Sequence, residues 1–178
     1  RTLDTPLNGT TQYTLDFNPL IPTGSMQNRL RLIGSDRSNA VVNVEDGVVT
    51  TNTAVSGSPM PEVKAAAYLN NFRGSTITSL LVIDRANSAL SVQNISDTVA
   101  TQGTLTRLSA LGITLDPLSP VGFDASGRNN ENQLLMARTS SSGNFSLYRV
   151  NSAVNSNPLT LIDAIASSSE FIDIAIRF

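Results

Sequence analysis

The chain has 178 residues and a formal net charge of −2; 40% of its residues are hydrophobic, and Cys, His and Trp are absent. The lack of Cys and His excludes Ser-His-Asp and Cys-His nucleophilic sites, thiol redox centres and the usual ligands of zinc, haem and iron–sulfur clusters, so that only oxygen-ligand sites for calcium or magnesium remain. The small net charge gives no electrostatic basis for nucleic-acid binding, and every apolar run is too short for a membrane span.

Short segments with period-two alternation, separated by turn residues, follow a predicted N-terminal arm at residues 1–14. In the first unit, 15–55, Arg alternates with aliphatic residues over Asn28–Ile33, which is typical of a strand with two different faces. Within the same unit, Ala40–Thr50 contains two apolar runs around a Glu-Asp-Gly turn, and this pattern predicts a hairpin.

Two further units repeat this organisation. The second, 63–112, and the third, 119–163, each contain four candidate strands, and 171–178 adds one more strand that we interpret as a closing strand. We therefore expect an all-β, propeller-like fold with about three four-stranded blades plus an extra strand, forming a single β domain. A β-sandwich with coincidental repeat spacing is the alternative.

The alternation also predicts which side chains form the core. In each short segment one set of side chains faces the interior and the other faces solvent. The predicted core residues are Phe17, Leu32, Val42, Val44, Tyr68, Leu81, Ile83, Phe123, Leu135, Leu147, Val150, Ile174 and Ile176.

Several motifs in a fixed order resemble those of a known family. They are Asp16-Phe17-Asn18-Pro19, Arg29–Leu32, Asn43–Gly47, Ala65–Phe72, Gly103–Leu105, Ala110–Gly112, Gly122–Asp124, Leu147–Val150 and Asp173–Ile176. The set resembles a family of secreted bacterial domains of unknown function with a DFNP motif and an AAAYTNNF-like motif. The resemblance implies a small exported propeller, and it implies no activity, cofactor or catalytic residue. Fifteen residues precede Asp16, fewer than in typical members, so we expect either further blades in a longer polypeptide or a fold that forms without them.

One candidate contact site combines two amides with a guanidinium. Asn70, Asn71 and Arg73 surround the aromatic ring of Phe72, and such a group suits a sugar or a partner protein. The structural alternative is a capping loop between two strands.

A second candidate site consists of Asp16, Asp124 and Asp173, which occupy similar places in their units. In a propeller these carboxylates would surround the central channel, where they could bind a cation such as calcium. The structural alternative is that each carboxylate accepts hydrogen bonds from the backbone of a turn.

The last predicted strand is a candidate interface for strand addition. Its apolar alternation suits a sheet that another chain completes. The residues of this interface are Phe171, Ile172, Ile174 and Ile176.

These patterns predict a non-enzymatic module with no catalytic, cofactor or metal residue. We expect a structural or protein-interaction role in a larger exported or cell-surface assembly, with a protein partner or a second copy, no nucleic acid and no membrane span. Export is expected because 57 of the 178 residues are Ser, Thr or Asn, a composition common in exported bacterial β proteins. The alternative is a propeller-like module that binds a glycan or a cation such as calcium.

Overall fold

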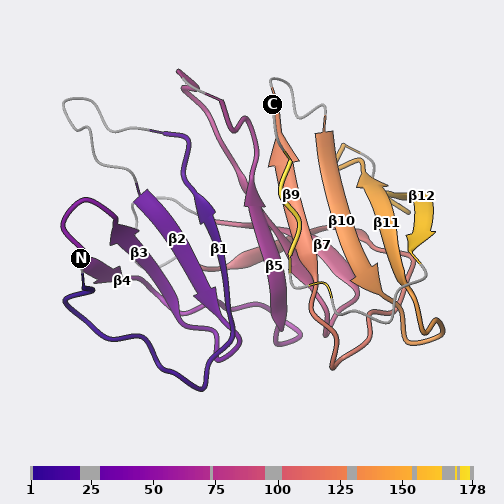
Figure 1. Cartoon of the computed structure of the whole chain (residues 1–178), viewed down its shortest axis with the longest axis horizontal. Coiled ribbons are helices and arrows are strands. Elements are labelled where there is room, and N and C mark those ends of the chain that lie inside the picture. The colour runs from indigo at the N-terminus through magenta and orange to yellow at the C-terminus, as the bar shows by residue number, and fades with distance from the viewer. Residues whose placement is uncertain are drawn as a thin grey trace.

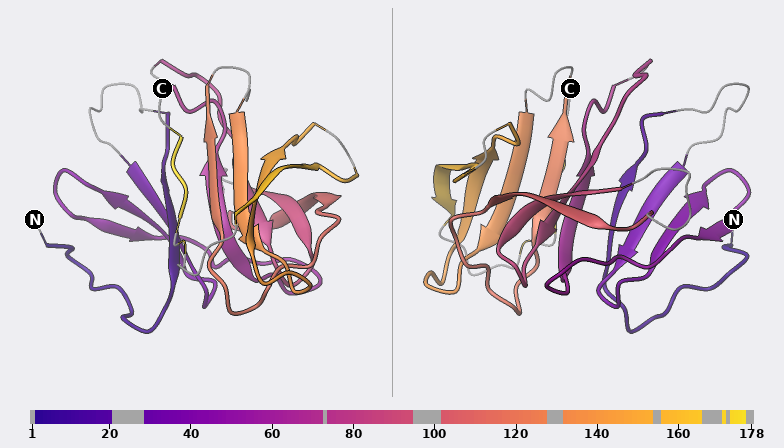
Figure 2. Two further views of the ribbon diagram at one scale, coloured as in Figure 1. Left: turned by 45° about the vertical axis from the view of Figure 1, so that its right-hand side comes forward. Right: turned by 180° about the vertical axis from the view of Figure 1, so that it is seen from behind.

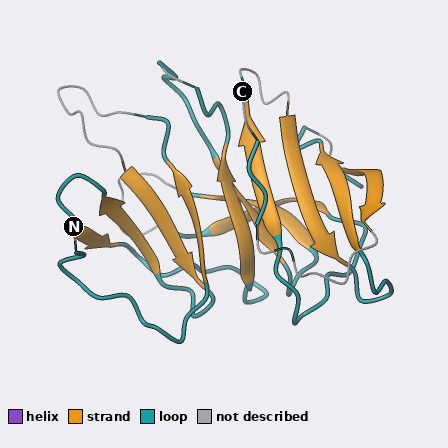
Figure 3. Ribbon diagram, viewed as in Figure 1, coloured by secondary structure: helices purple, strands orange, loops and turns teal. Residues whose placement is uncertain are grey.

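The protein is built from β-strands. The computed structural model describes residues 2–20, 29–72, 74–94, 102–127, 132–153, 156–165, 171 and 173–176, and these residues form twelve strands and no helix (Figures 1 and 3). In this part of the chain, therefore, no helix is long and apolar enough to cross a membrane. The all-β prediction is confirmed.

Three antiparallel sheets of four strands follow one another along the chain, each with its strands in sequence order. Sheet 1 contains β1 (Tyr13–Phe17), β2 (Arg29–Gly34), β3 (Asn39–Asn43) and β4 (Val49–Thr51). Sheet 2 contains β5 (Val63–Tyr68), β6 (Leu80–Asp84), β7 (Ala89–Gln93) and β8 (Leu105–Ala110). Sheet 3 contains β9 (Gly122–Ser126), β10 (Asn132–Arg138), β11 (Phe145–Val150) and β12 (Leu159–Ile165).

The first strand of each sheet is its inner strand. β5 contacts both β1 and β9, and it lies between them in Figure 1, with sheet 1 on one side and sheet 3 on the other. Seen from behind in Figure 2, sheet 2 comes forward between its two neighbours. The arrangement is propeller-like, as predicted, although the described residues form no closed ring of sheets.

Local chemistry explains the turns that separate the strands. Between β3 and β4, Gly47 has φ of +84°, a conformation that glycine adopts without a steric penalty. The Gly47 N–H donates to the Asn43 carbonyl at 2.8 Å, and the Val48 N–H donates to Asp46 Oδ1 at 3.0 Å. The hairpin predicted within Ala40–Thr50 is therefore present.

The predicted N-terminal arm runs along the outer edge of sheet 1. The Asp4 N–H donates to the Gly47 carbonyl at 3.1 Å, and Asp4 Oδ1 accepts the Val49 N–H at 2.9 Å. These bonds cover part of the edge of β4, which would otherwise expose backbone groups to another chain. The first strand begins at Tyr13, two residues before the predicted start of the first unit.

The core lies in the two spaces between adjacent sheets. Sheets 1 and 2 enclose the smaller cluster, which contains Ile33, Val55, Val63, Ala66, Tyr68, Leu80 and Val82. Sheets 2 and 3 enclose the larger cluster, in which Ala65, Ala67, Leu81, Ile83 and Leu90 meet Phe123, Leu135, Tyr148 and Val150. Sheet 2 is thus apolar on both faces because each face packs against another sheet.

Most predicted core residues are buried, and five are not fully buried. Phe17 and Val44 are exposed, which corrects the prediction for both. Phe17 lies on the side of β1 that faces away from sheet 2, and Val44 lies in the hairpin beyond the end of β3. Leu147, Ile174 and Ile176 are half-buried.

Candidate functional site

Polar side chains of β1 bind the backbone of β5. Thr14 Oγ1 accepts the Ala66 N–H at 3.0 Å, and Asp16 Oδ2 accepts the Tyr68 N–H at 2.6 Å. The other carboxylate oxygen of Asp16 accepts the N–H of Phe17 at 2.7 Å. Because the later acceptor on β1 pairs with the later donor on β5, the two inner strands run in the same direction.

The same arrangement recurs at the far side of sheet 3. Asp124 Oδ1 accepts the Ala125 N–H at 2.7 Å, and Asp124 Oδ2 accepts the Ile176 N–H at 2.6 Å. Acceptor and donor are 52 residues apart here, as they are in the Asp16–Tyr68 pair. The segment 173–176 therefore lies beside β9 as β5 lies beside β1, and Figure 1 shows this yellow segment in front of β9. We call the Asp16–Tyr68 and Asp124–Ile176 bonds the inter-sheet carboxylate contacts.

Gly122 supports this alignment by its lack of a side chain. It precedes Asp124 by two residues, as Thr14 precedes Asp16. A Cβ at Gly122 would lie 2.7 Å from the backbone nitrogen of Ile174, so only glycine allows the segment to approach β9 this closely. Thr14 and Gly122 thus occupy matching places beside Ala66 and Ile174.

The carboxylate contacts satisfy backbone donors that the sheets leave unpaired. An inner strand has a sheet neighbour on one edge only, so alternate N–H groups on its other edge need acceptors. Charged acceptors make strong bonds to such donors. The structural alternative stated for the aspartates, hydrogen bonding to backbone, therefore describes both Asp16 and Asp124.

Burial and repulsion between carboxylates raise the pKa of Asp16 and of Asp173. Desolvation, reinforced by the charges of Asp124 and Asp173, raises the pKa of Asp16 to about 6, although the N–H groups of Tyr68 and Phe17 oppose the shift. Desolvation, with a smaller contribution from Asp124, also raises the pKa of Asp173. The three predicted aspartates therefore lie within electrostatic range of one another. Nevertheless, the described residues include no group of three acidic side chains arranged to hold a metal ion.

A buried polar network between sheets 1 and 2 was not expected from the sequence. Arg31 Nε donates to the Tyr68 hydroxyl at 3.3 Å, and Arg31 Nη1 donates to Asn39 Oδ1 at 2.8 Å. Asn39 in turn donates to the Thr53 carbonyl at 2.9 Å. Arginine alternating with leucine indicates a solvent-facing side, and the only local signal against it is that Ile33 lies on the same face.

The predicted amide site is a turn at the end of β5. Asn70 has φ of +55°, a conformation that asparagine tolerates, and its carbonyl accepts the Phe72 N–H at 2.9 Å. This geometry is that of the capping-loop alternative. Arg73 lies outside the described residues, so the grouping of Asn70, Asn71 and Arg73 stays a prediction.

Three of the predicted strand-addition residues, Phe171, Ile174 and Ile176, pack against sheet 3. The ring of Phe171 meets the ring of Phe145 edge-on, with centroids 5.5 Å apart, and Ile174 lies against Gly122. Ile176 is joined to Asp124 as described above. Ile172 lies outside the described residues, and the described positions 171 and 173–176 are not part of a strand.

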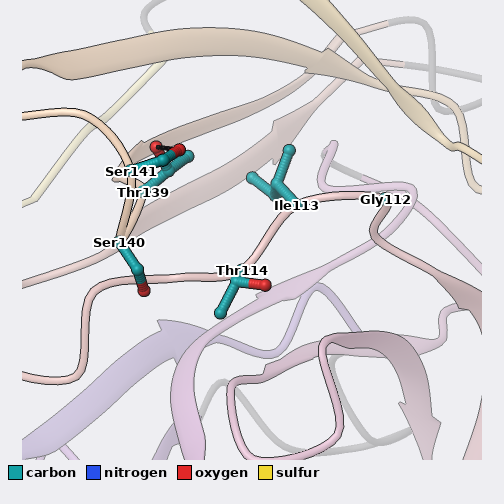
Figure 4. Close-up of a pocket in the computed structure, with 6 residues that line it drawn as sticks. All are labelled: Gly112, Ile113, Thr114, Thr139, Ser140 and Ser141. Atoms are coloured by element: carbon teal, nitrogen blue, oxygen red, sulfur yellow. Dashed lines mark hydrogen bonds between the residues drawn. The ribbon is translucent and has the colours of Figure 1, made fainter.

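A shallow groove between two loops offers little chemistry. Gly112, Ile113, Thr114, Thr139, Ser140 and Ser141 line it (Figure 4). Ser140 Oγ donates to the Leu115 carbonyl at 3.1 Å, and the hydroxyls of Thr139 and Ser141 lie 3.3 Å apart. None of these six described residues has an acidic or basic side chain of the kind that acid–base catalysis uses.

Comparison with known protein families assigns the chain to one of them. The family model of a domain of unknown function, DUF4394, matches residues 1–175. The chain belongs to DUF4394. Searches among curated proteins and among solved structures returned no match. The resemblance to an uncharacterised family is thus confirmed, and in this DUF4394 chain the first residue of the Asp16–Pro19 motif makes one of the inter-sheet carboxylate contacts.

Proposed function

We propose that this DUF4394 chain is a non-enzymatic structural or protein-interaction module of a larger assembly. The observation that carries the proposal is the open side of β1. Leu15 is 53% exposed and Phe17 is 48% exposed, although β1 is an inner strand of a packed series of sheets.

On the other two inner strands, β5 and β9, the matching side is covered by a neighbouring sheet. Tyr68 is on the side of β5 that meets sheet 1 and is 0% exposed, and Ala125 is on the side of β9 that meets sheet 2 and is 1% exposed. Phe17 follows Asp16 as Ala125 follows Asp124, so the two have matching places in their sheets. By this comparison, the side of β1 that carries Leu15 and Phe17 is suited to packing against another protein surface.

The polar groups of the site support a structural role. Each of the two carboxylates in the inter-sheet contacts accepts a backbone N–H on both of its oxygens. Catalysis by a pair of acids requires carboxyl groups that are free to reach a substrate. The cation-binding alternative needs carboxylate oxygens as ligands, and these oxygens are engaged with the chain itself.

We place the assembly outside the cytoplasm or at the cell surface. Support for export comes from the composition, in which Ser, Thr and Asn make up 57 of 178 residues. The architecture we propose for the assembly is a complete propeller, in which further sheets join the three described sheets and cover the exposed side of β1.

Site-specific photo-crosslinking in the native producer tests the proposal. Benzoylphenylalanine replaces Phe17 in one variant and Leu118, a 92% exposed loop residue, in the control. We expect a discrete protein adduct from position 17 and none from position 118. Absence of an adduct at position 17, together with saturable binding of calcium or of a glycan on an array, would favour the alternative function.

A further inference from the structure

We infer that the segment 173–176 is the inner strand of a fourth sheet, and that an apolar antiparallel β-strand from outside the described residues binds along its outward edge. This inference rests on the proposed function and adds to it a second contact surface, with the class of partner that this surface would bind. The partner is recognised through backbone hydrogen bonds, as in other cases of strand addition.

The position of the segment relative to sheet 3 is the first step. Ile174 and Ile176 meet Gly122 and Asp124 of β9, as Ala66 and Tyr68 meet Thr14 and Asp16 of β1. The two pairs of strands therefore share one register. In sheet 2, the strand held in this way is the inner strand of a complete sheet.

The residue between the two positions that contact β9 faces the opposite, outward edge of the segment. In β5 this residue is Ala67, which pairs with Leu81 of β6. The matching residue of the segment is Ala175, between Ile174 and Ile176. Within the described part of the chain, neither a strand nor an isolated bridge pairs with Ala175.

The second strands of the three sheets indicate which kind of strand would pair with the segment 173–176. The second strand of every sheet is antiparallel to the inner strand and contains several apolar residues: Leu30, Leu32 and Ile33 in β2, Leu80–Ile83 in β6 and Leu134–Ala137 in β10. Leu134 and Leu147, on the side of sheet 3 that Gly122 and Asp124 share, are only half-buried. A strand beside 173–176 would lie over them, so we expect an apolar strand.

A peptide with the sequence of β10 serves as the probe, since β10 is the antiparallel partner of an inner strand in this fold. The capped, fluorescent peptide Asn132–Arg138 is titrated with the full chain, and polarisation is measured. A peptide of the same composition in scrambled order is the reference. We expect saturable binding of the β10 peptide and no binding of the scrambled one.

Variants at Ala175 test whether the backbone edge is responsible. Ala175→Pro removes the N–H that faces the edge and should weaken binding by about tenfold or more. Ala175→Val keeps the N–H and should bind as the unchanged chain does. In the unchanged chain, the peptide should also slow hydrogen exchange of the Ala175 amide, a readout that does not depend on the folding of the proline variant.

Three outcomes would overturn the inference: equal binding of both peptides, unchanged affinity in Ala175→Pro, or no protection of the Ala175 amide. None of them bears on the crosslinking at position 17, which lies on a different strand. A failure of the edge hypothesis can therefore be told apart from a failure of the proposed function.

Discussion

The Asp16 side chain, on the inner strand β1, lies where folding removes much of the surrounding water. Asp16 loses hydration on folding, and the N–H groups of Tyr68 and Phe17 replace part of it. Desolvation outweighs these two hydrogen bonds, and the pKa of Asp16 therefore rises to about 6. At the scale of single residues, the carboxylate that aligns two sheets also makes the stability of the fold depend on pH.

Asp16→Asn should remove a specific part of this pH dependence. A carboxyl group whose pKa is near 4 in the unfolded chain and about 6 in the folded chain contributes stability below about pH 4, and this stability is lost as the pH rises through 6. The unchanged protein should therefore gain roughly 2 kcal/mol from Asp16 between pH 7 and pH 4.5.

Urea unfolding at the two pH values measures this gain. The control is Asp163→Asn, because Asp163 is exposed and also accepts the following backbone N–H, that of Ala164. We expect a smaller stability difference between the two pH values for Asp16→Asn than for the control. Equal differences would show that Asp16 does not carry the effect.

The buried guanidinium of Arg31 should depend on Asn39. Asn39→Ala leaves one donor of the Arg31 guanidinium without its acceptor, and a buried charged donor that loses its hydrogen bond costs roughly 2–3 kcal/mol of unfolding free energy. The exposed Asn144→Ala should cost less than about 0.5 kcal/mol. In the double variant Arg31→Met/Asn39→Ala the charge is absent, so much of the loss should be recovered. A single-variant cost no larger than that of Asn144→Ala would contradict this role.

The strands and turns could be predicted because they depend on local sequence pattern, whereas the packing of one sheet against another could not. Alternation predicted the strands, and the Glu-Asp-Gly turn predicted the hairpin before β4. Phe17 and Tyr68 have similar local sequences, but only Tyr68 meets a neighbouring sheet, and no local pattern reports that. The similarity of Asp16 and Asp124 was visible in the sequence. Their backbone donors were not, because they lie 52 residues further along the chain.

Gly122→Ala should displace the segment 173–176 from sheet 3. The added methyl group would lie 2.7 Å from the Ile174 nitrogen, and relieving such a clash typically costs about 1–3 kcal/mol. We expect a lower melting temperature and faster hydrogen exchange at the Ile176 amide. Gly143→Ala is the control, because no atom lies within 4 Å of a Cβ at that position. Unchanged exchange at Ile176 would mean that the close approach to Gly122 does not hold the segment.

At the scale of the whole molecule, the described series of sheets exposes a different surface at each of its two ends. One is the side of β1 with Leu15 and Phe17 exposed, and the other is the segment 173–176, which sheet 3 holds but no second strand accompanies within the described residues. Exposed apolar surface and unpaired strand edges favour association with other chains. The central claim is therefore that this protein works in contact with another protein.

The most direct test is the mass of the native particle, measured by size-exclusion chromatography with light scattering. The chain alone has a mass of 18.9 kDa. The account predicts a larger native particle, and it predicts that the double variant Leu15→Ser/Phe17→Ser shifts the particle toward the mass of the single chain while leaving the β-sheet circular dichroism spectrum unchanged. A native particle of 18.9 kDa, stable and soluble without a partner, would contradict it.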